Sequence, residues 1–183
     1  FFIDERFKNN FYPLNENNSH IYDTSYALGK FELYQKVTTV ENPAIIQAEA
    51  YLFPMDSTSY SVGGTWVKLE ENFDYEIDRI LGYIRLNSVQ NAIAIAYTTT
   101  TFDPINQSFG QDQYTTGTNF KSVYDECVEN SENYQQDCNG LITLKLLKDN
   151  QPSTPTSPTW PLMFKNVYSL GGSNIEPNGL ELE

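Results

Sequence analysis

Three carboxylates spaced two residues apart in "NFDYEIDRILGYIRL" are the first candidates for chemistry. Asp74, Glu76 and Asp78 alternate with apolar residues, so on a β-strand they would project from one face. Successive side chains on one strand face stand roughly 7 Å apart, and oxygen ligands in that arrangement can hold calcium when a loop closes over them. We favour the simpler interpretation, a solvated strand face on which Arg85 of the returning strand offsets the repulsion.

The single histidine and the remaining carboxylates give weaker signals for catalysis. His20 lies in a polar stretch, and the sequence contains neither a Gly-x-Ser-x-Gly nucleophile motif nor a phosphate-binding loop. The two carboxylates of a glycosidase leave no sequence signature, and with 24 acidic residues in the chain no pair stands out. We therefore predict no catalytic residues, no bound cofactor and a protein that is not an enzyme, with a secreted hydrolase as the least favoured alternative.

Two cysteines, Cys127 and Cys138, flank the polar stretch "VENSENYQQD". A zinc site needs three or four ligands, and His20 lies about a hundred residues away, so zinc is not expected. A disulfide that closes this short loop would stabilise the fold by roughly 3 kcal/mol. We favour that disulfide and an oxidising compartment over two free thiols.

Aromatic side chains are the candidates for binding. They make up 14% of the chain, so large rings must supply most of the buried area. Trp66 and Trp160 would stack on sugars if they were exposed, which makes a carbohydrate-binding module the alternative function. Both tryptophans lie in apolar alternation ("TWVKL", "TWPLMF"), and this favours the core for each of them.

The charge balance excludes several classes of partner. Eleven basic residues among 24 acidic ones, a formal net charge of −13, argue against nucleic acid and against anionic membrane surfaces. No apolar run approaches the roughly 20 residues of a spanning helix, so we expect no direct membrane insertion by this segment. The abrupt start "FFIDERF" and the closing "LE" indicate a single soluble domain excised from a larger protein.

The elements that would position these residues are mostly strands. Residues 1–29 predict a short amphipathic helix, with aromatics four residues apart and a proline after it, followed by a polar loop. Over residues 30–150 the apolar pattern has a period of two. In "KFELYQKV" it predicts Phe31 and Leu33 on one face, with Glu32 and Tyr34 on the other.

The carboxylate-bearing segment predicts a β-hairpin with one dry face. Phe73, Tyr75 and Ile77 would lie on that face, and Gly82 would supply a positive φ in the turn. "NAIAIAYTTTT" predicts a strand covered on both faces, and residues 102–140 a polar loop insertion. Strands spaced about ten residues apart predict a mainly β, antiparallel β-sandwich-like domain with a short N-terminal helix and long polar loops.

The last part of the chain consists of a segment rich in Ser, Thr and Pro followed by a segment rich in aromatic residues. Residues 151–159, with prolines at three-residue intervals, predict an extended linker. Residues 160–175 form an aromatic closing segment, which we expect to dock on the N-terminal "FFIDERFKNNF" and join the two ends, with packing on a partner as the alternative. The side chains expected to make this contact are Trp160, Met163, Phe164 and Tyr168.

Three stretches, in this order, resemble a known family. They are "FFIDERFKNNFY" leading to "KFELYQKV", then "WVKLEENFDYEIDRILGYIRLNSVQNAIAIAY", and finally "LITLKLLKDN…SPTWPLMFKNVYSLGG". Together they are similar to the SprA (also called Sov) family of gliding-motility proteins, which form the outer-membrane translocon of the type IX secretion system. The resemblance spans residues 1 to about 175, the final block is the most specific, and the cysteine loop at 125–140 departs from the family pattern.

The resemblance implies a soluble domain inserted into a much larger outer-membrane protein of a Gram-negative bacterium, on the periplasmic or the extracellular side. Its partners would be the remainder of the translocon, other secretion-system proteins or secreted cargo. The family supplies no catalytic or cofactor-binding residues to carry over. We therefore expect a non-enzymatic structural and interaction domain, with an extracellular carbohydrate-binding module as the alternative.

Overall fold

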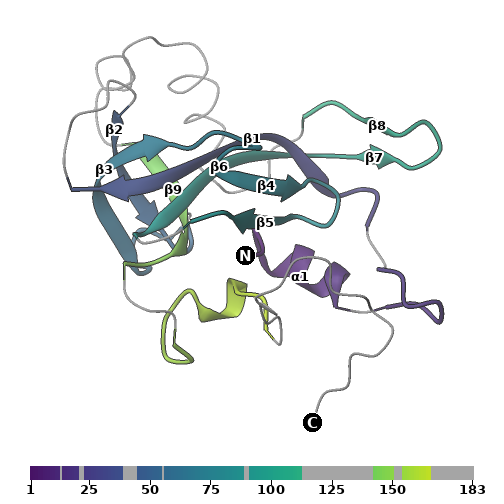
Figure 1. Ribbon diagram of the computed structural model, residues 1–183, viewed down its shortest axis with the longest axis horizontal. Coiled ribbons are helices and arrows are strands. Elements are labelled where there is room, and N and C mark those ends of the chain that lie inside the picture. Colours follow the sequence, from purple (N-terminus) through teal and green to yellow (C-terminus); the bar gives the residue numbers. More distant parts are fainter. Residues whose placement is uncertain are drawn as a thin grey trace.

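The computed structural model describes residues 1–12, 14–20, 23–38, 45–54, 56–88, 91–112, 142–150 and 154–165 (Figure 1). The fold is mainly β with one short α-helix, and both of these predictions are confirmed. The elements are α1 (Glu5–Phe11), β1 (Ala27–Val37), β2 (Ile45–Tyr51), β3 (Ser61–Lys68), β4 (Tyr75–Asp78), β5 (Tyr83–Leu86), β6 (Ile93–Thr100), β7 (Phe102–Asp103), β8 (Ser108–Phe109), β9 (Ile142–Lys148) and the 3-10 turn η2 (Trp160–Leu162). The described part of the chain contains no helix that is both long and apolar enough to span a bilayer.

Five strands close into a barrel in the order β1-β3-β2-β9-β6, with β6 again beside β1 (Figure 1). Neighbouring barrel strands are antiparallel except β2 and β9, which run parallel. The predicted β-sandwich is therefore wrong in its architecture, because a single sheet curls onto itself. Closure pairs both edges of every barrel strand, so none of the five presents an open edge to solvent.

The face of the barrel wall that points into the lumen combines large rings with small residues. Trp66 of β3 is fully buried, and its indole N–H donates to the carbonyl oxygen of Ala48 at 3.1 Å. Gly64 lies opposite Ala48 on the neighbouring strand, and Ala94 lies opposite the buried Tyr34. A five-stranded barrel is narrow, so these small wall residues leave the space that the rings fill.

The outer face of β1 and β6 is covered by the β4–β5 hairpin, with α1 beside the hairpin (Figure 1). Leu33 and Ile95 are register partners on this face and are fully buried. The Phe31 ring lies on the same face, 5.8 Å from the Tyr75 ring of β4, measured between ring centroids. Strand β6 is consequently buried along all eight of its residues, as its sequence predicted.

Two side chains of the alternating segments differ in exposure from their neighbours in the pattern. Glu32 lies on the face opposite Phe31 and Leu33, as predicted, and is 5% exposed because that face points into the barrel lumen. The Tyr34 hydroxyl donates to Glu32 Oε2 at 2.7 Å and the Lys68 ammonium pairs with Oε1, so the buried carboxylate is compensated. Phe73, expected on the dry face of the hairpin, is 75% exposed because it lies in the turn that precedes β4.

The polar insertion and the linker also differ from their predictions. Residues 102–109 form the short β7–β8 hairpin, which extends away from the barrel (Figure 1). Residues 154–159 form turns, in which the Ser157 N–H donates to the Thr154 carbonyl oxygen at 2.8 Å, so this part is not an extended linker. Cys127 and Cys138 lie outside the described residues, so their predicted disulfide stays a prediction.

Gly82, in the turn between β4 and β5, lies directly against α1. Its φ of +63° is the left-handed conformation that the hairpin prediction required. Its carbonyl oxygen accepts from the Ile3 N–H at 2.9 Å, and a Cβ added to it would lie 2.0 Å from the Phe7 ring. The hairpin turn and the helix therefore approach each other as closely as the absence of a side chain allows.

We predict that Gly82→Ala lowers the free energy of unfolding by about 2–5 kcal/mol. The left-handed conformation costs a side chain roughly 1–2 kcal/mol, and forcing a methyl group against Phe7 adds roughly 1–3 kcal/mol. Chemical denaturation measures the loss. In a Phe7→Ala background the loss should be smaller, because the Cγ and Cδ atoms that meet the methyl group are gone. An equal loss in both backgrounds would contradict the close contact.

Candidate functional site

The three predicted calcium ligands lie apart from one another. Asp74 precedes β4 and accepts the Glu70 N–H at 2.8 Å. Glu76 pairs with Arg85 across the hairpin at 3.6 Å, while Asp78 accepts two backbone N–H groups of the turn that follows it. Within the described ranges no three His, Cys, Asp or Glu side chains are grouped to hold a metal ion. Each carboxylate has its own local partners, and calcium binding stays a prediction.

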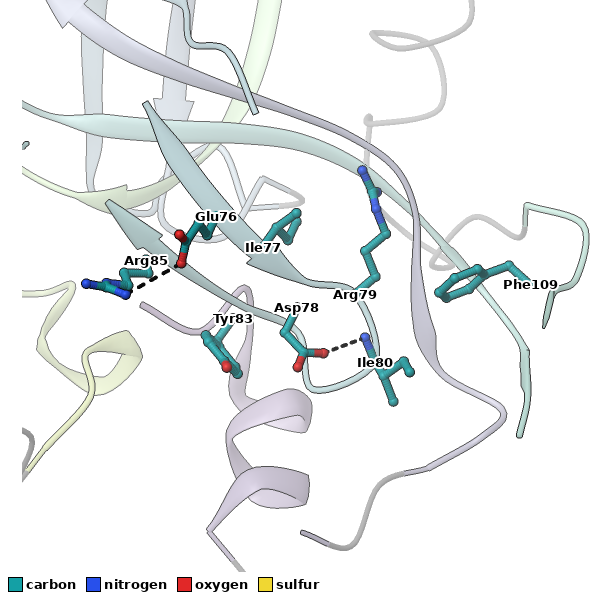
Figure 2. A pocket seen from close by; sticks show the side chains of 8 residues that line it. All are labelled: Glu76, Ile77, Asp78, Arg79, Ile80, Tyr83, Arg85 and Phe109. Atoms are coloured by element: carbon teal, nitrogen blue, oxygen red, sulfur yellow. Dashed lines mark hydrogen bonds and ion pairs between the residues drawn. The ribbon is translucent and has the colours of Figure 1, made fainter. Parts of the chain in front are cut away.

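An open hollow of about 450 Å³ lies over the outer face of the β4–β5 hairpin (Figure 2). Figure 2 shows Glu76 directed at Arg85 on one side of the hollow and the Phe109 ring on the other. The Arg79 guanidinium donates to a β1 carbonyl oxygen at 2.6 Å and pairs with Glu71 at 2.8 Å. Because the charged groups that line the hollow are already bonded to one another or to backbone, it is a poor site for an ionic ligand.

A second hollow, of about 330 Å³, adjoins α1, the chain just after β2, and η2. We call it the Lys145 pocket, because it is lined mainly by apolar side chains together with this lysine of β9, which is 9% exposed. The residues around it include Asp4, Leu52, Phe53, Lys145, Pro161 and Leu162. A concave, mostly apolar hollow with a few polar groups is the usual form of a small-ligand site.

Asp4, beside the Lys145 pocket, connects the helix to the barrel. Its Oδ1 accepts the backbone N–H groups of Arg6 at 3.0 Å and Phe7 at 3.1 Å, which caps α1. Its Oδ2 accepts the hydroxyls of Tyr26 at 2.8 Å and Tyr97 at 3.2 Å. One carboxylate thus links α1 to β6 and to the residue that precedes β1.

The burial of these groups shifts their ionisation. Burial raises the pKa of Tyr26, and the negative charge of Asp4 raises it further. The same two causes raise the pKa of Tyr97 well above its ordinary value, so both hydroxyls stay neutral donors at neutral pH. Burial lowers the pKa of Lys145, while the nearby charges of Asp4 and Glu5 oppose that shift.

The C-terminal aromatic segment packs on the N-terminal segment through Phe164. Its ring stacks on Phe2 with centroids 4.2 Å apart and meets Phe11 edge to face at 5.0 Å. The Phe2 N–H donates to the Leu162 carbonyl oxygen at 2.8 Å. We call Phe2, Phe11 and Phe164 the end cluster.

The other residues predicted to make this contact have different positions. Trp160 and Met163 are half-buried, and the Lys165 ammonium lies 5.4 Å from the centre of the Trp160 ring. Tyr168 lies outside the described residues. Trp66, the other candidate for sugar stacking, is fully buried in the barrel, so its predicted place in the core is confirmed.

His20 packs on the last residue of α1, Phe11. Its Nδ1 lies 2.7 Å from the Phe11 carbonyl oxygen, to which the Nδ1–H donates, and its ring stacks on Phe11 with centroids 4.2 Å apart. Sequence reasoning missed two other residues, Asp4 and Lys145. The signal for Asp4 was a carboxylate just ahead of a predicted helix, and for Lys145 a lysine with apolar residues on both sides in "LITLKLLK".

Comparisons with known proteins add no assignment to this geometry. No protein-family model matches the chain, and neither curated proteins nor solved structures gave a significant match. The resemblance to the SprA family therefore stays a prediction from the sequence, and functional inference depends on the residues described above.

We predict that Asp4→Ala lowers the free energy of unfolding by about 3–7 kcal/mol. The change removes a helix cap worth roughly 1 kcal/mol. It also removes the acceptor of two buried tyrosine hydroxyls, and the loss of each hydrogen bond costs roughly 1–3 kcal/mol. Asp4→Asn retains an oxygen that can cap α1, so it should cost clearly less in guanidinium denaturation. If Asp4→Ala were as stable as the unchanged chain, the link between helix and barrel would be refuted.

Proposed function

We propose that the chain is a non-enzymatic structural and interaction domain of a SprA-type outer-membrane translocon, which acts in type IX secretion and gliding motility. The observation that carries the proposal is the end cluster, which joins the first twelve residues to residues 160–165. A domain inserted into a larger scaffold leaves the scaffold and returns to it at neighbouring points, so contact between an early and a late segment of the chain supports the proposal.

The way in which both segments meet the hairpin supports the same proposal. The Phe164 ring lies 5.2 Å from Tyr83 of β5, and Phe2 forms an antiparallel bridge with Tyr83. The Ile84 N–H donates to the Phe1 carbonyl oxygen at 2.8 Å. Both segments are thus attached to the element that covers the barrel, which suits an inserted domain held in a fixed orientation.

In this proposal the domain lies on the periplasmic or the extracellular side of the outer membrane of a Gram-negative bacterium. Its partners are the remainder of the translocon, other secretion-system proteins or cargo. The net charge of −13 supports contacts with proteins over contacts with nucleic acid. The alternative, a carbohydrate-binding module, gains no support from Trp66, whose ring is enclosed by the barrel.

We predict that Phe164→Ala lowers the free energy of unfolding by about 1–3 kcal/mol, because a half-buried ring that contacts two others is lost. Hydrogen exchange should quicken at the amides of Phe2 and Ile3, which bond to residues 162 and 82. Phe73→Ala is the matched control, since a ring that is 75% exposed should contribute less than about 0.5 kcal/mol. Unchanged exchange at Phe2 in the Phe164 variant would contradict the joining of the two segments.

The secretion role is tested in the bacterium that carries the gene. An in-frame deletion of residues 1–165 should leave the parent protein in the outer membrane while type IX cargo accumulates in the periplasm, because the domain's contacts with the translocon or the cargo are lost. Immunoblots of cargo in periplasm and medium measure the effect, with the abundance of the parent protein in the outer-membrane fraction as the control. Normal secretion by the deletion strain, or a parent protein absent from the outer membrane of unmodified cells, would refute the proposal.

A further inference from the structure

The Lys145 pocket places a buried cation in an apolar hollow. Lys145 is 9% exposed and lines the pocket together with Leu52 and Phe53. Among the described residues, the ammonium of Lys145 makes no hydrogen bond and no ion pair. The charges of Asp4 and Glu5 act on this ammonium without a direct bond to it, and Nζ does not belong to the fully buried, unbonded side-chain atoms of the described residues, so it is open to a direct anionic partner from the pocket.

The two carboxylates of α1 nearest to the pocket are engaged elsewhere. Both oxygens of Asp4 accept hydrogen bonds, from the helix N-terminus on one side and from two tyrosines on the other. Glu5 pairs with Lys8 at 3.1 Å, and Arg6 pairs with an aspartate that precedes β1. In the part of the chain that the structure describes, Lys145 is therefore the charged side chain of the pocket that has no direct partner.

The remaining walls suit an apolar ligand. Leu162 is almost fully buried, while Phe53 is 58% exposed, and both line the pocket. The volume of about 330 Å³ falls at the lower end of the range of small-molecule sites, about 300–1,000 Å³. The pocket thus has room for a ring or a short alkyl chain beside the ammonium.

We propose that the Lys145 pocket binds a carboxylate attached to an apolar group, with the ammonium donating to the carboxylate and the apolar walls covering the attached group. A singly charged anion matches the single available cation, whereas a doubly charged phosphate would face Asp4 and Glu5 with no second cation to offset them. The carboxylate comes from a small organic acid or from a polypeptide. The inference does not depend on the proposed role in secretion.

Binding has a consequence for the ionisation of the lysine. Burial lowers the pKa of Lys145 in the free protein. A carboxylate in contact with the ammonium favours the charged form, so the pKa of Lys145 should rise when the ligand binds. This provides a readout at the proposed contact itself.

The experiment is an NMR titration of the full chain with labelled lysine side chains, using 3-phenylpropionate as the probe and the neutral 3-phenylpropanamide as its match. The carboxylate should bind saturably and raise the pKa of Lys145, and the amide should bind at least about tenfold more weakly, as expected for the loss of one charge-assisted hydrogen bond. Lys145→Met keeps an unbranched apolar side chain, one atom shorter and without the charge, and should weaken binding of the acid by about tenfold or more. Lys148→Met is the matched control on the same strand; the Lys148 ammonium donates to the Asp149 carbonyl oxygen at 2.8 Å, and its removal should leave binding unchanged.

A second arm separates the two sources of the carboxylate. A short peptide ending in phenylalanine with a free carboxylate is compared with the same peptide ending in an amide. Tighter binding of the free peptide than of 3-phenylpropionate indicates a polypeptide end, and the reverse order indicates a small acid.

Three results would overturn the proposal: no saturable binding of either acid, equal binding of acid and amide, or unchanged binding by Lys145→Met. If that variant fails to fold, the NMR titration of the unmodified chain is the test. A pKa of Lys145 that stays unchanged at saturating 3-phenylpropionate also overturns the proposal.

Discussion

Strand β6 pairs with β1 along one edge and with β9 along the other, and this double pairing closes the barrel. Closure turns one face of β6 into the lumen and the hairpin covers the other, so all eight residues of the strand are buried and both sides need apolar partners. Inside, alanine and glycine on the wall leave space for the Trp66 and Tyr34 rings. Outside, the aliphatic row that contains Leu33 and Ile95 requires a cover, which the β4–β5 hairpin supplies.

The positions of the two hollows follow from how that cover is attached. The helix α1 is linked to the barrel by the Asp4 carboxylate, which also caps the helix, and by the packing of Phe7 on Tyr26. It is linked to the hairpin by the close approach of Gly82 to Phe7. Where α1 and η2 meet β9, the cover is incomplete, and Lys145 lies in the space that remains. The same elements that pack at this junction, α1, η2 and β9, therefore also line the proposed binding pocket.

Sequence patterns predicted the local elements well, because each is specified by its own residues. The helix was marked by aromatics four residues apart, the hairpin by alternation around Gly82, and β6 by an unbroken apolar run. Closure was not predictable, because it depends on which strands meet: the parallel β2–β9 pair leaves no mark in either strand. For the same reason the burial of Glu32 was not predictable, since alternation shows two faces but not that both are covered. Lys145 was missed because a lysine within a strand ordinarily reaches solvent, and only the packing of α1 and η2 over β9 buries it.

The parallel pairing of β2 with β9 also bears on how the chain acquires its fold. It joins residues nearly a hundred positions apart, so loop-closure entropy delays this pairing relative to the hairpin and to neighbours such as β2 and β3. Until β9 arrives, β2 and β6 each keep an unpaired edge, and unpaired edges are templates for association with other chains. A nascent or truncated chain that ends before residue 142 is therefore the form most prone to aggregation, and a chaperone that shields strand edges would act on it during this interval.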